Sequence, residues 1–384
     1  MHILVLPSFY PSVARPSTGS FFADQVQMLR RAGHQVGVLV APRLRELVHV
    51  IQRERRLPDL TRAEREDTQL YRMYGGWFPR VFPLISAYLH RVVGLRAFAQ
   101  YCDDQGPPDV IHVHNIFYSG YIAAQIQQVY DIPFVLTEHS SNFVRGRVFL
   151  PGQHWVARRT LAHCAQPLAV GESVGRAIQR YTDKTVETVG NVVDTASLDL
   201  APPATDPFTV AIAARLIPLK RVDVLLRAFA AAFPTGDARL IIGGNGPQAD
   251  DLKQLAAERG VTDRVDFRGW LDRAGMRQLY HDGHVLVSAS EFETFGLTLA
   301  EAMSCGRPVI ATRSGGPEGF VTEATGLLIP VDDVKALASA MQTMKANYTL
   351  YDPQAIRAYC VEQFGEAAMA QRLQQIYQDA IVGG

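Results

Sequence analysis

The stretch VLVSASEFETFGLTLAEAM, residues 285–303, passes from a short apolar run through a loop into a second apolar segment. Its first four residues predict a buried strand, and the spacing of apolar residues predicts a helix that begins at about Leu297. Two carboxylates, Glu293 and Glu301, flank this helix start. A strand, a loop and a helix in this order are the repeating unit of a parallel, helix-covered sheet.

The same unit recurs on both sides of a Pro-rich segment, residues 199–207, which predicts an interdomain linker. Before this linker we expect strands at 3–6, 35–41, 110–113 and 134–137 and helices at 21–32 and 122–130. After it we expect strands at 208–214, 239–242, 265–268, 285–288, 309–311 and 327–329 and helices at 222–233, 334–345 and 366–381. This alternation predicts the α/β class, as two Rossmann-like βαβ domains facing each other across a cleft.

Composition narrows the class of protein. The 384 residues are 47% hydrophobic and 20% charged, as expected of a soluble globular chain. The 38 Lys and Arg balance the 38 Asp and Glu, so the overall charge does not favour nucleic acid as a partner. The four cysteines form no C-x-x-C pair, which fits the reducing cytoplasm. No apolar run reaches the roughly 18 residues of a transmembrane helix.

Two cations of the second domain follow a predicted strand. Arg215 comes directly after the strand at 208–214, and Lys220 lies where the next helix begins. Ligands of open α/β sheets bind beyond the carboxyl ends of the strands. An Arg fork, a Lys charge and a helix N-terminus together suit a diphosphate. The alternative, two solvated surface cations, is equally compatible with these residues alone.

The two glutamates need a different ligand group, because a carboxylate repels phosphate. Glu293 and Glu301 would accept hydrogen bonds from neutral hydroxyls, while the N–H groups at the helix start would face an anion. Gly296 would let the backbone approach that ligand closely. A nucleotide sugar carries hydroxyls on both sides of a diphosphate and satisfies all these groups. Helix capping is the simpler alternative for Glu293.

These residues resemble a known family. Glu293-x7-Glu301 with Phe295-Gly-Leu297 between them, followed by EAMSCGRPVIA at 301–311 and a Gly-Gly pair at 315–316, is similar to the donor site of retaining glycosyltransferase family 4. Matching segments run along nearly the whole chain: 16–19, 32–36, 112–114, 137–139, 190–194 and 244–247. The resemblance implies the GT-B fold, with an acceptor-binding domain at 1–195 and a donor-binding domain at 206–365. The last helix, 366–384, would pack back onto the first domain.

The resemblance also implies roles for individual residues. Glu301 would hold the ribose hydroxyls, and Glu293, with backbone groups of Phe295, Gly296 and Leu297, would hold the transferred sugar. The diphosphate would lie between Arg215 and Lys220 and would receive a backbone contact from Gly19. His139 would lie beneath the donor sugar. We therefore expect His139, Arg215, Lys220 and Glu293 to serve catalysis. The first loop reads Ser17-Thr-Gly-Ser20 where the family often has Gly-Gly, so only Gly19 can be matched there.

The implied activity is the retaining transfer of a sugar from a UDP- or GDP-linked donor to a hydroxyl acceptor. A lipid-linked molecule or a precursor of a polysaccharide or cell-surface glycan would serve as that acceptor, in the cytoplasm. In this family the departing phosphate accepts the proton, so Glu293 is not expected to act as a general acid or nucleophile. A nucleotide-sugar epimerase of the same fold and a non-catalytic nucleotide-sugar-binding protein are the alternatives.

Neither a metal nor another cofactor is expected. The chain has no D-x-D motif of the kind that holds a divalent ion in the other main glycosyltransferase fold. His112 and His114 would share one face of a strand, which could suit a metal, but no third ligand is evident nearby. Packing is the favoured interpretation of this pair.

Residues 72–101 are basic and rich in aromatic side chains, with no acidic residue. Such a segment can form a helix that lies on an anionic membrane, which would suit a lipid-linked acceptor. A core-facing helix with arginines extended to the solvent is the favoured alternative. The sequence does not indicate an oligomeric state.

Overall fold

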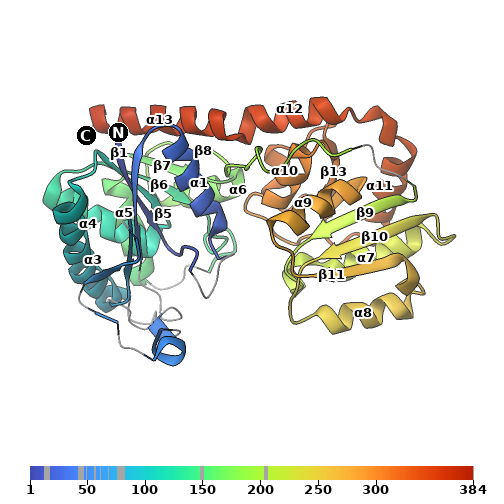
Figure 1. Cartoon of the computed structure of the whole chain (residues 1–384), viewed down its shortest axis with the longest axis horizontal. Coiled ribbons are helices and arrows are strands. Elements are labelled where there is room, and N and C mark those ends of the chain that lie inside the picture. Colours follow the sequence, from blue (N-terminus) through green and yellow to red (C-terminus); the bar gives the residue numbers. More distant parts are fainter. Residues whose placement is uncertain are drawn as a thin grey trace. The chain divides into compact units, whose positions relative to one another are not determined.

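The computed structural model describes residues 1–12, 18–41, 47–48, 50–55, 58–60, 62–67, 69–75, 83–147, 151–202 and 206–383. The chain divides into two compact units (Figure 1). Unit 1 comprises Met1–Val192 and Met369–Gly384, and unit 2 comprises Val193–Ala368. Each is built around its own sheet.

In the described part of unit 1 the sheet has eight strands, in the order β3-β4-β2-β1-β5-β6-β7-β8. The strands are β1 His2–Pro7, β2 Gln35–Val40, β3 Ala63–Arg65, β4 Leu70–Met73, β5 Val110–His114, β6 Phe134–Glu138, β7 Gln166–Ala169 and β8 Glu187–Thr188. Neighbouring strands run parallel, except that β3 is antiparallel to β4. The direction of strand addition reverses between β1 and β5, which makes their carboxyl ends the topological switch point.

Helices bury both faces of this sheet. They are α1 Ser20–Arg31, α3 Pro83–Gln105, α4 Tyr121–Tyr130, α5 Pro151–His163, α6 Glu172–Ile178 and α13 Glu366–Gly383, with the short turns η1 Val50–Glu54, η2 Ile116–Gly120 and η3 Gln179–Tyr181. In β1, Leu4 packs into the core shared with α3 and α4, and Ile3 packs into the core shared with α1 and α13. Two buried faces explain why the strand is apolar at successive positions rather than at alternate ones. Leu373 and Tyr377 of α13 lie fully in this second core.

Unit 2 contains a parallel sheet of six strands in the order β11-β10-β9-β12-β13-β14, counted over the residues that the structure describes. The strands are β9 Phe208–Ala213, β10 Ala238–Gly243, β11 Val265–Gly269, β12 Val285–Ser288, β13 Val309–Thr312 and β14 Gly326–Ile329. The helices are α7 Val222–Ala232, α8 Ala249–Glu258, α9 Arg273–Asp282, α10 Leu297–Ser304, α11 Val334–Ala346 and α12 Pro353–Phe364, with short turns η4 Pro218–Lys220, η5 Thr262–Arg264, η6 Pro317–Gly319 and η7 Tyr348–Leu350. Here the switch point lies between β9 and β12.

The sequence predictions of these elements are largely confirmed. Every predicted strand and helix is present, with ends displaced by one or two residues, and α10 begins at the predicted Leu297. The strands β3, β4, β7 and β8 were not predicted. They are two to four residues long, and polar or proline residues interrupt their apolar pattern.

The basic aromatic segment is split between two elements. Arg72 belongs to β4, where its buried guanidinium pairs with Glu66 and donates to the carbonyl of Pro11 at 3.0 Å. Phe98 and Tyr101 of α3 lie in the core of unit 1, which supports the core-facing interpretation for this part of the helix. Residues 76–82, with Trp77, Phe78, Arg80 and Phe82, lie outside the described residues. None of the described helices is both long enough and apolar enough to cross a bilayer.

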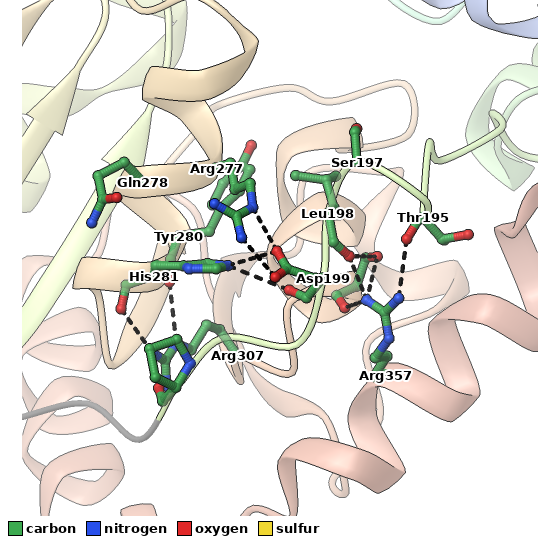
Figure 2. Close-up of polar contacts among 12 residues, drawn as sticks. Thr195, Ser197, Leu198, Asp199, Arg277, Gln278, Tyr280, His281, Arg307 and Arg357 are labelled. Carbon is green, nitrogen blue, oxygen red and sulfur yellow. Dashed lines mark hydrogen bonds and ion pairs between the residues drawn. The ribbon is translucent and has the colours of Figure 1, made fainter.

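The segment that joins the two predicted domains is fixed to unit 2 along residues 194–202 (Figure 2). Asp199 receives two hydrogen bonds from Arg277, at 2.5 and 2.6 Å, and these lower the pKa of its carboxyl to about 2. Arg357 donates to the carbonyls of Thr195 and Leu198. The described part of the predicted linker, residues 199–202, belongs to unit 2, and side chains of that unit hold it in place.

Arg307 is the most deeply buried charged side chain among those that hold this joining segment, with 2% of its surface exposed. Its guanidinium donates to the carbonyls of Tyr280 at 3.1 Å, His281 at 2.7 Å and Pro202 at 2.8 Å. It also donates to the Tyr348 hydroxyl at 3.0 Å. One side chain thus satisfies acceptors from the joining segment, from α9 and from the turn after α11.

We predict that Arg307→Leu will lower the free energy of unfolding by about 3 kcal/mol, because it leaves buried acceptors without a donor. Urea denaturation followed by fluorescence measures this change. Arg239→Leu, at an exposed position of β10, is the matched control and should shift stability by less than about 0.5 kcal/mol. Equal stability of the two variants would contradict this role of Arg307.

Candidate functional site

The switch point of unit 2 brings two loops together. The loop after β9 holds Arg215 and continues into η4, and the loop after β12 leads into α10. β9 and β12 are hydrogen-bonded neighbours. The loops are also tied directly, because the backbone N–H of Glu291 donates to the carbonyl of Leu219 at 2.9 Å. The parallel topology therefore places residues about 70 positions apart in the chain at one edge of the sheet.

An ion pair between Lys220 and Glu293 forms the centre of this edge. The Lys220 ammonium contacts the Glu293 carboxylate, and the hydroxyl of Ser290 donates to the same carboxylate oxygen at 2.8 Å. The backbone N–H of Glu293 donates to the carbonyl of Ser314 at 3.1 Å. The side chain of Lys220 is 22% exposed and that of Glu293 is 17% exposed. The neighbouring residues therefore hold the pair in position, and a ligand can still reach it.

The helix α10 starts beside this pair with no side-chain cap. Gly296, the residue before its first turn, has φ +102°, a conformation that glycine adopts without steric cost. Phe295 is buried, with ring centroids 5.1 Å from Phe320 and 5.0 Å from Phe364, and it fixes the entry of the chain into the helix. The first N–H groups, at Leu297 and the next residue, are the ones a helix leaves without internal acceptors. They are suited to an anion.

Glu301 lies on the second turn of α10 and is held by the neighbouring helix α9. The hydroxyl of Tyr280 donates to its carboxylate at 2.5 Å. Tyr280 is buried, and burial together with the charge of Glu301 raises the pKa of its phenol well above the usual value. Sequence reasoning missed Tyr280. The spacing of apolar residues in α9 could have placed it on the buried face, but nothing in the sequence links it to Glu301.

Arg215 is exposed, and within the described part of the chain its guanidinium has no hydrogen-bond partner. The structure thus joins Lys220 with Glu293. Phe295, Gly296 and Leu297 follow Glu293 directly in the chain, and Glu301 lies on α10, the helix that begins at Leu297. Arg215 lies at the end of the adjacent strand with its charge available.

In unit 1, Gly19 and His139 border the same aromatic ring. Gly19 precedes α1 with φ +79°, and a Cβ there would lie 3.3 Å from the Phe22 ring and 2.9 Å from that of Phe9. His139 follows β6, and its ring centroid lies 5.1 Å from that of Phe22. Pro16 and Ser17 of the first-loop motif lie outside the described residues.

Neutral histidine side chains lie next to the Phe22 ring. The Nε2 atom of His139 lies 2.9 Å from Nδ1 of His114. Burial lowers the pKa of His139, and likewise that of His112, to about 3. His112 contacts the hydroxyls of Tyr377 at 2.6 Å and Thr137 at 2.8 Å, which supports the packing interpretation of this ring. Over the residues described, no group of three or more His, Cys, Asp or Glu side chains is arranged to hold a metal ion.

Two family models match this chain, one in each half. The family model described as Glycosyltransferase Family 4 matches residues 19–197, and that described as Glycosyl transferases group 1 matches residues 207–347. The D-inositol 3-phosphate glycosyltransferase of Corynebacterium glutamicum is 30% identical over 308 residues, which cover 71% of this chain and 72% of that protein. This chain belongs to glycosyltransferase family 4. Matches to three other curated relatives cover only 43% to 65% of their own lengths.

Solved structures agree with this membership at the level of the fold. Sucrose-phosphate synthase from Thermosynechococcus elongatus aligns over 100% of both chains with a TM-score of 0.77 and 21% identity. Anabaena HepE, in complex with UDP and glucose, aligns over 98% of this chain and 100% of that chain with a TM-score of 0.72 and 18% identity. The GT-B class predicted for this family 4 chain, with two parallel-sheet α/β units, is confirmed.

The neutral histidines predict how the stability of unit 1 depends on pH. The folded-state pKa of His112 lies near 3, below the 6.5 of an unfolded chain. The unfolded state therefore binds more protons as the pH falls below 6.5, and stability present above that pH is lost progressively. We predict that denaturant midpoints fall between pH 7.5 and pH 5.

His112→Gln should make this pH dependence shallower, because one such group is removed, whatever its effect on stability at pH 7.5. The matched control is His154→Gln, on the partly exposed side of α5, which should keep the wild-type slope. If His112→Gln and wild type lose stability in parallel, His112 is not neutral in the folded protein.

Proposed function

We propose that this family 4 chain is a retaining glycosyltransferase that moves a sugar from a UDP- or GDP-linked donor to a hydroxyl acceptor. The observation that carries the proposal is the contact between Lys220 and Glu293 next to the uncapped start of α10. A cation, a carboxylate and backbone N–H donors meet there. A diphosphate attached to a sugar matches these groups, since it offers negative charge and hydroxyl donors side by side.

Each residue then has a chemical role. Lys220, Arg215 and the N–H groups at Gly296 and Leu297 bind the diphosphate. Hydroxyls of the transferred sugar donate to Glu293, displacing the Lys220 ammonium toward the phosphate. The ribose hydroxyls donate to Glu301, whose carboxylate is already oriented by Tyr280. Binding both ends of the donor in this way would orient its anomeric carbon for attack.

The proposed reaction breaks the bond between the anomeric carbon and the diphosphate oxygen and forms a bond to the acceptor oxygen on the same face. The acceptor proton passes to the departing phosphate. Lys220 stabilises the charge that develops on that phosphate in the transition state. No protein group serves as the base, and no metal is required in this scheme. His139 lies next to the sugar as a neutral imidazole, and Gly19 gives a backbone contact to the phosphates.

Unit 1 is proposed to bind the acceptor, a lipid-linked molecule or a glycan precursor. Contact with the cytoplasmic face of a membrane belongs to the same proposal. It is supported at the start of α3, where Ile85 and Tyr88 are 47% and 62% exposed and Arg91 is also exposed. The complex of Anabaena HepE with UDP and glucose supports a nucleotide sugar as donor.

A thermal-shift panel of UDP, GDP, ADP and their common sugars tests the proposal, since a ligand that binds only the folded state raises its melting temperature. We expect one nucleoside diphosphate and its sugar to bind. We also expect the diphosphate to be released from that donor whether or not EDTA is present.

Epimerised sugar from donor alone would favour the epimerase. Tight nucleotide binding with no turnover or hydrolysis would favour a binding protein, and loss of activity in EDTA would contradict metal independence.

We predict that Glu301→Ala will weaken binding of the nucleoside diphosphate by about tenfold to a hundredfold, because charge-assisted hydrogen bonds to the ribose are lost. Titration calorimetry measures the dissociation constant. Glu323→Ala, at an exposed position of the same unit, is the control and should bind as wild type does. Wild-type affinity in Glu301→Ala would refute the ribose assignment.

We predict that Lys220→Ala will reduce kcat by about a hundredfold to a thousandfold, since Lys220 contacts charge that grows in the transition state. Steady-state release of the nucleoside diphosphate measures this. Lys253→Ala removes an exposed lysine from α8 and should leave kcat unchanged. A turnover number for Lys220→Ala within twofold of wild type would rule out the leaving-group role.

A further inference from the structure

A buried carboxylate, that of Glu138, lies at the carboxyl edge of the unit 1 sheet. Glu138 is the last residue of β6, is fully buried, and directly precedes His139 in the chain. Among the described residues no cation pairs with it. Removing a carboxylate from water is costly unless other groups compensate for the lost hydration. The groups that compensate here indicate what this side chain does.

Backbone N–H groups of two neighbouring loops provide the compensation. The Oε2 atom of Glu138 accepts the N–H of Ile116 at 2.9 Å, in the loop after β5. The Oε1 atom accepts the N–H of His139 at 3.0 Å and that of Ser140 at 2.7 Å, in the loop after β6. β5 and β6 are hydrogen-bonded neighbours. One carboxylate therefore joins the two loops where they leave the sheet.

Ile116 is also the first residue of a helical segment. η2 continues directly into α4, so the carboxylate accepts an N–H at the amino end of this segment. The positive end of a helix dipole stabilises a negative charge. Burial raises the pKa of the Glu138 carboxyl to about 7, and the three N–H groups oppose this rise. The carboxyl is therefore mostly ionised at pH 8.

An ionised carboxylate matches these three donors better than any other side chain of its size. Both of its oxygens accept, and neither carries a hydrogen. The amide of glutamine has nearly the same shape, but its nitrogen donates and would face one of the N–H groups with a second donor. A buried N–H without an acceptor is costly. Glu138→Gln therefore changes the hydrogen bonding of the loops with little change in side-chain shape.

The ring of His139 is confined by other neighbours. Its Nε2 atom lies 2.9 Å from Nδ1 of His114. The ring centroids of Phe21 and Phe22, on α1, lie 5.3 Å and 5.1 Å from that of His139. These contacts limit the rotation of the ring but do not fix the backbone that carries it. The bond from the His139 N–H to Glu138 fixes that backbone.

We propose that Glu138 is a positioning residue for the transferase reaction, whose carboxylate holds the loop after β6 so that the imidazole of His139 keeps the orientation that the reaction needs. This assignment rests on the proposed function, in which His139 lies next to the transferred sugar. A displacement of about 1 Å at a reacting centre can lower the rate about a hundredfold. Loss of the Glu138 bonds should thus lower turnover and leave the diphosphate site of unit 2 intact.

Chemical modification tests the positioning without depending on activity. Diethyl pyrocarbonate carbethoxylates accessible neutral imidazoles, and mass spectrometry of the peptides gives the rate at each histidine. At pH 8 we expect Glu138→Gln to raise the rate at His139 by about fivefold or more, because the loop is released. The rate at His112, which is 1% exposed in the same sheet, should stay that of the wild type. The matched control is Glu172→Gln, at an exposed position of α6, which should change neither rate.

Steady-state release of the nucleoside diphosphate tests the link to the reaction. We expect Glu138→Gln to lower kcat by about tenfold to a hundredfold, and the dissociation constant of the nucleoside diphosphate to stay within about twofold of wild type. Glu172→Gln should turn over as the wild type does. Glu138→Asp keeps the charge on a side chain one methylene shorter, and should show the same changes in His139 reactivity and in kcat to a smaller extent.

The assignment is overturned if Glu138→Gln modifies His139 at the wild-type rate, if it keeps the wild-type kcat, or if nucleotide affinity falls as far as kcat does. A rise at both His139 and His112 reports general loss of the fold, and Glu138→Asp then takes the place of Glu138→Gln in both measurements. Nucleotide binding and turnover of the wild type separate this result from the proposed function. If the wild type does neither, the transferase proposal fails, and the modification rate of His139 alone decides whether Glu138 holds the loop.

Discussion

The ion pair between Lys220 and Glu293 depends on the whole architecture of unit 2. The two residues come from loops that follow β9 and β12, and only a parallel sheet whose strand order reverses between these strands brings the loops together. The hydroxyl of Ser290 donates to the carboxylate of Glu293, and the carbonyl of Ser314 accepts the backbone N–H of the same residue. Because the pair is partly exposed, its mutual attraction contributes little to stability. The two charges are instead positioned to bind a ligand that carries both negative charge and hydroxyl groups.

Unit 1 repeats this topology with different chemistry at its switch point. Where unit 2 places a lysine and two glutamates, unit 1 places Gly19 and neutral histidines whose pKa values are lowered by burial. In the function proposed for this chain, unit 2 would bind the charged diphosphate and unit 1 would bind the hydroxylated acceptor.

The sequence predicted a strand or helix best where one pattern of apolar residues extends along the whole element. Strands such as β1 are buried on both faces, so their continuous apolar runs were unambiguous, and the helix start at Leu297 followed from apolar spacing. Contacts between distant elements were not predictable in this way. Tyr280 donates to Glu301, and Arg307 donates to acceptors of three separate segments, through packing that the local sequence does not indicate. Family resemblance supplied the roles of Glu293 and Glu301, and the structure added the neighbours that orient them.

The central claim is that Glu293 binds the transferred sugar while Lys220 binds the diphosphate. The most direct measurement compares the affinities of Glu293→Gln and wild type for a nucleoside diphosphate and for the corresponding nucleotide sugar. We predict that the substitution weakens binding of the nucleotide sugar by about tenfold or more, because charge-assisted hydrogen bonds from the sugar hydroxyls are lost. The nucleoside diphosphate should bind equally well or more tightly, because Lys220 loses its intramolecular partner. Equal weakening of both ligands, or of neither, would contradict the account.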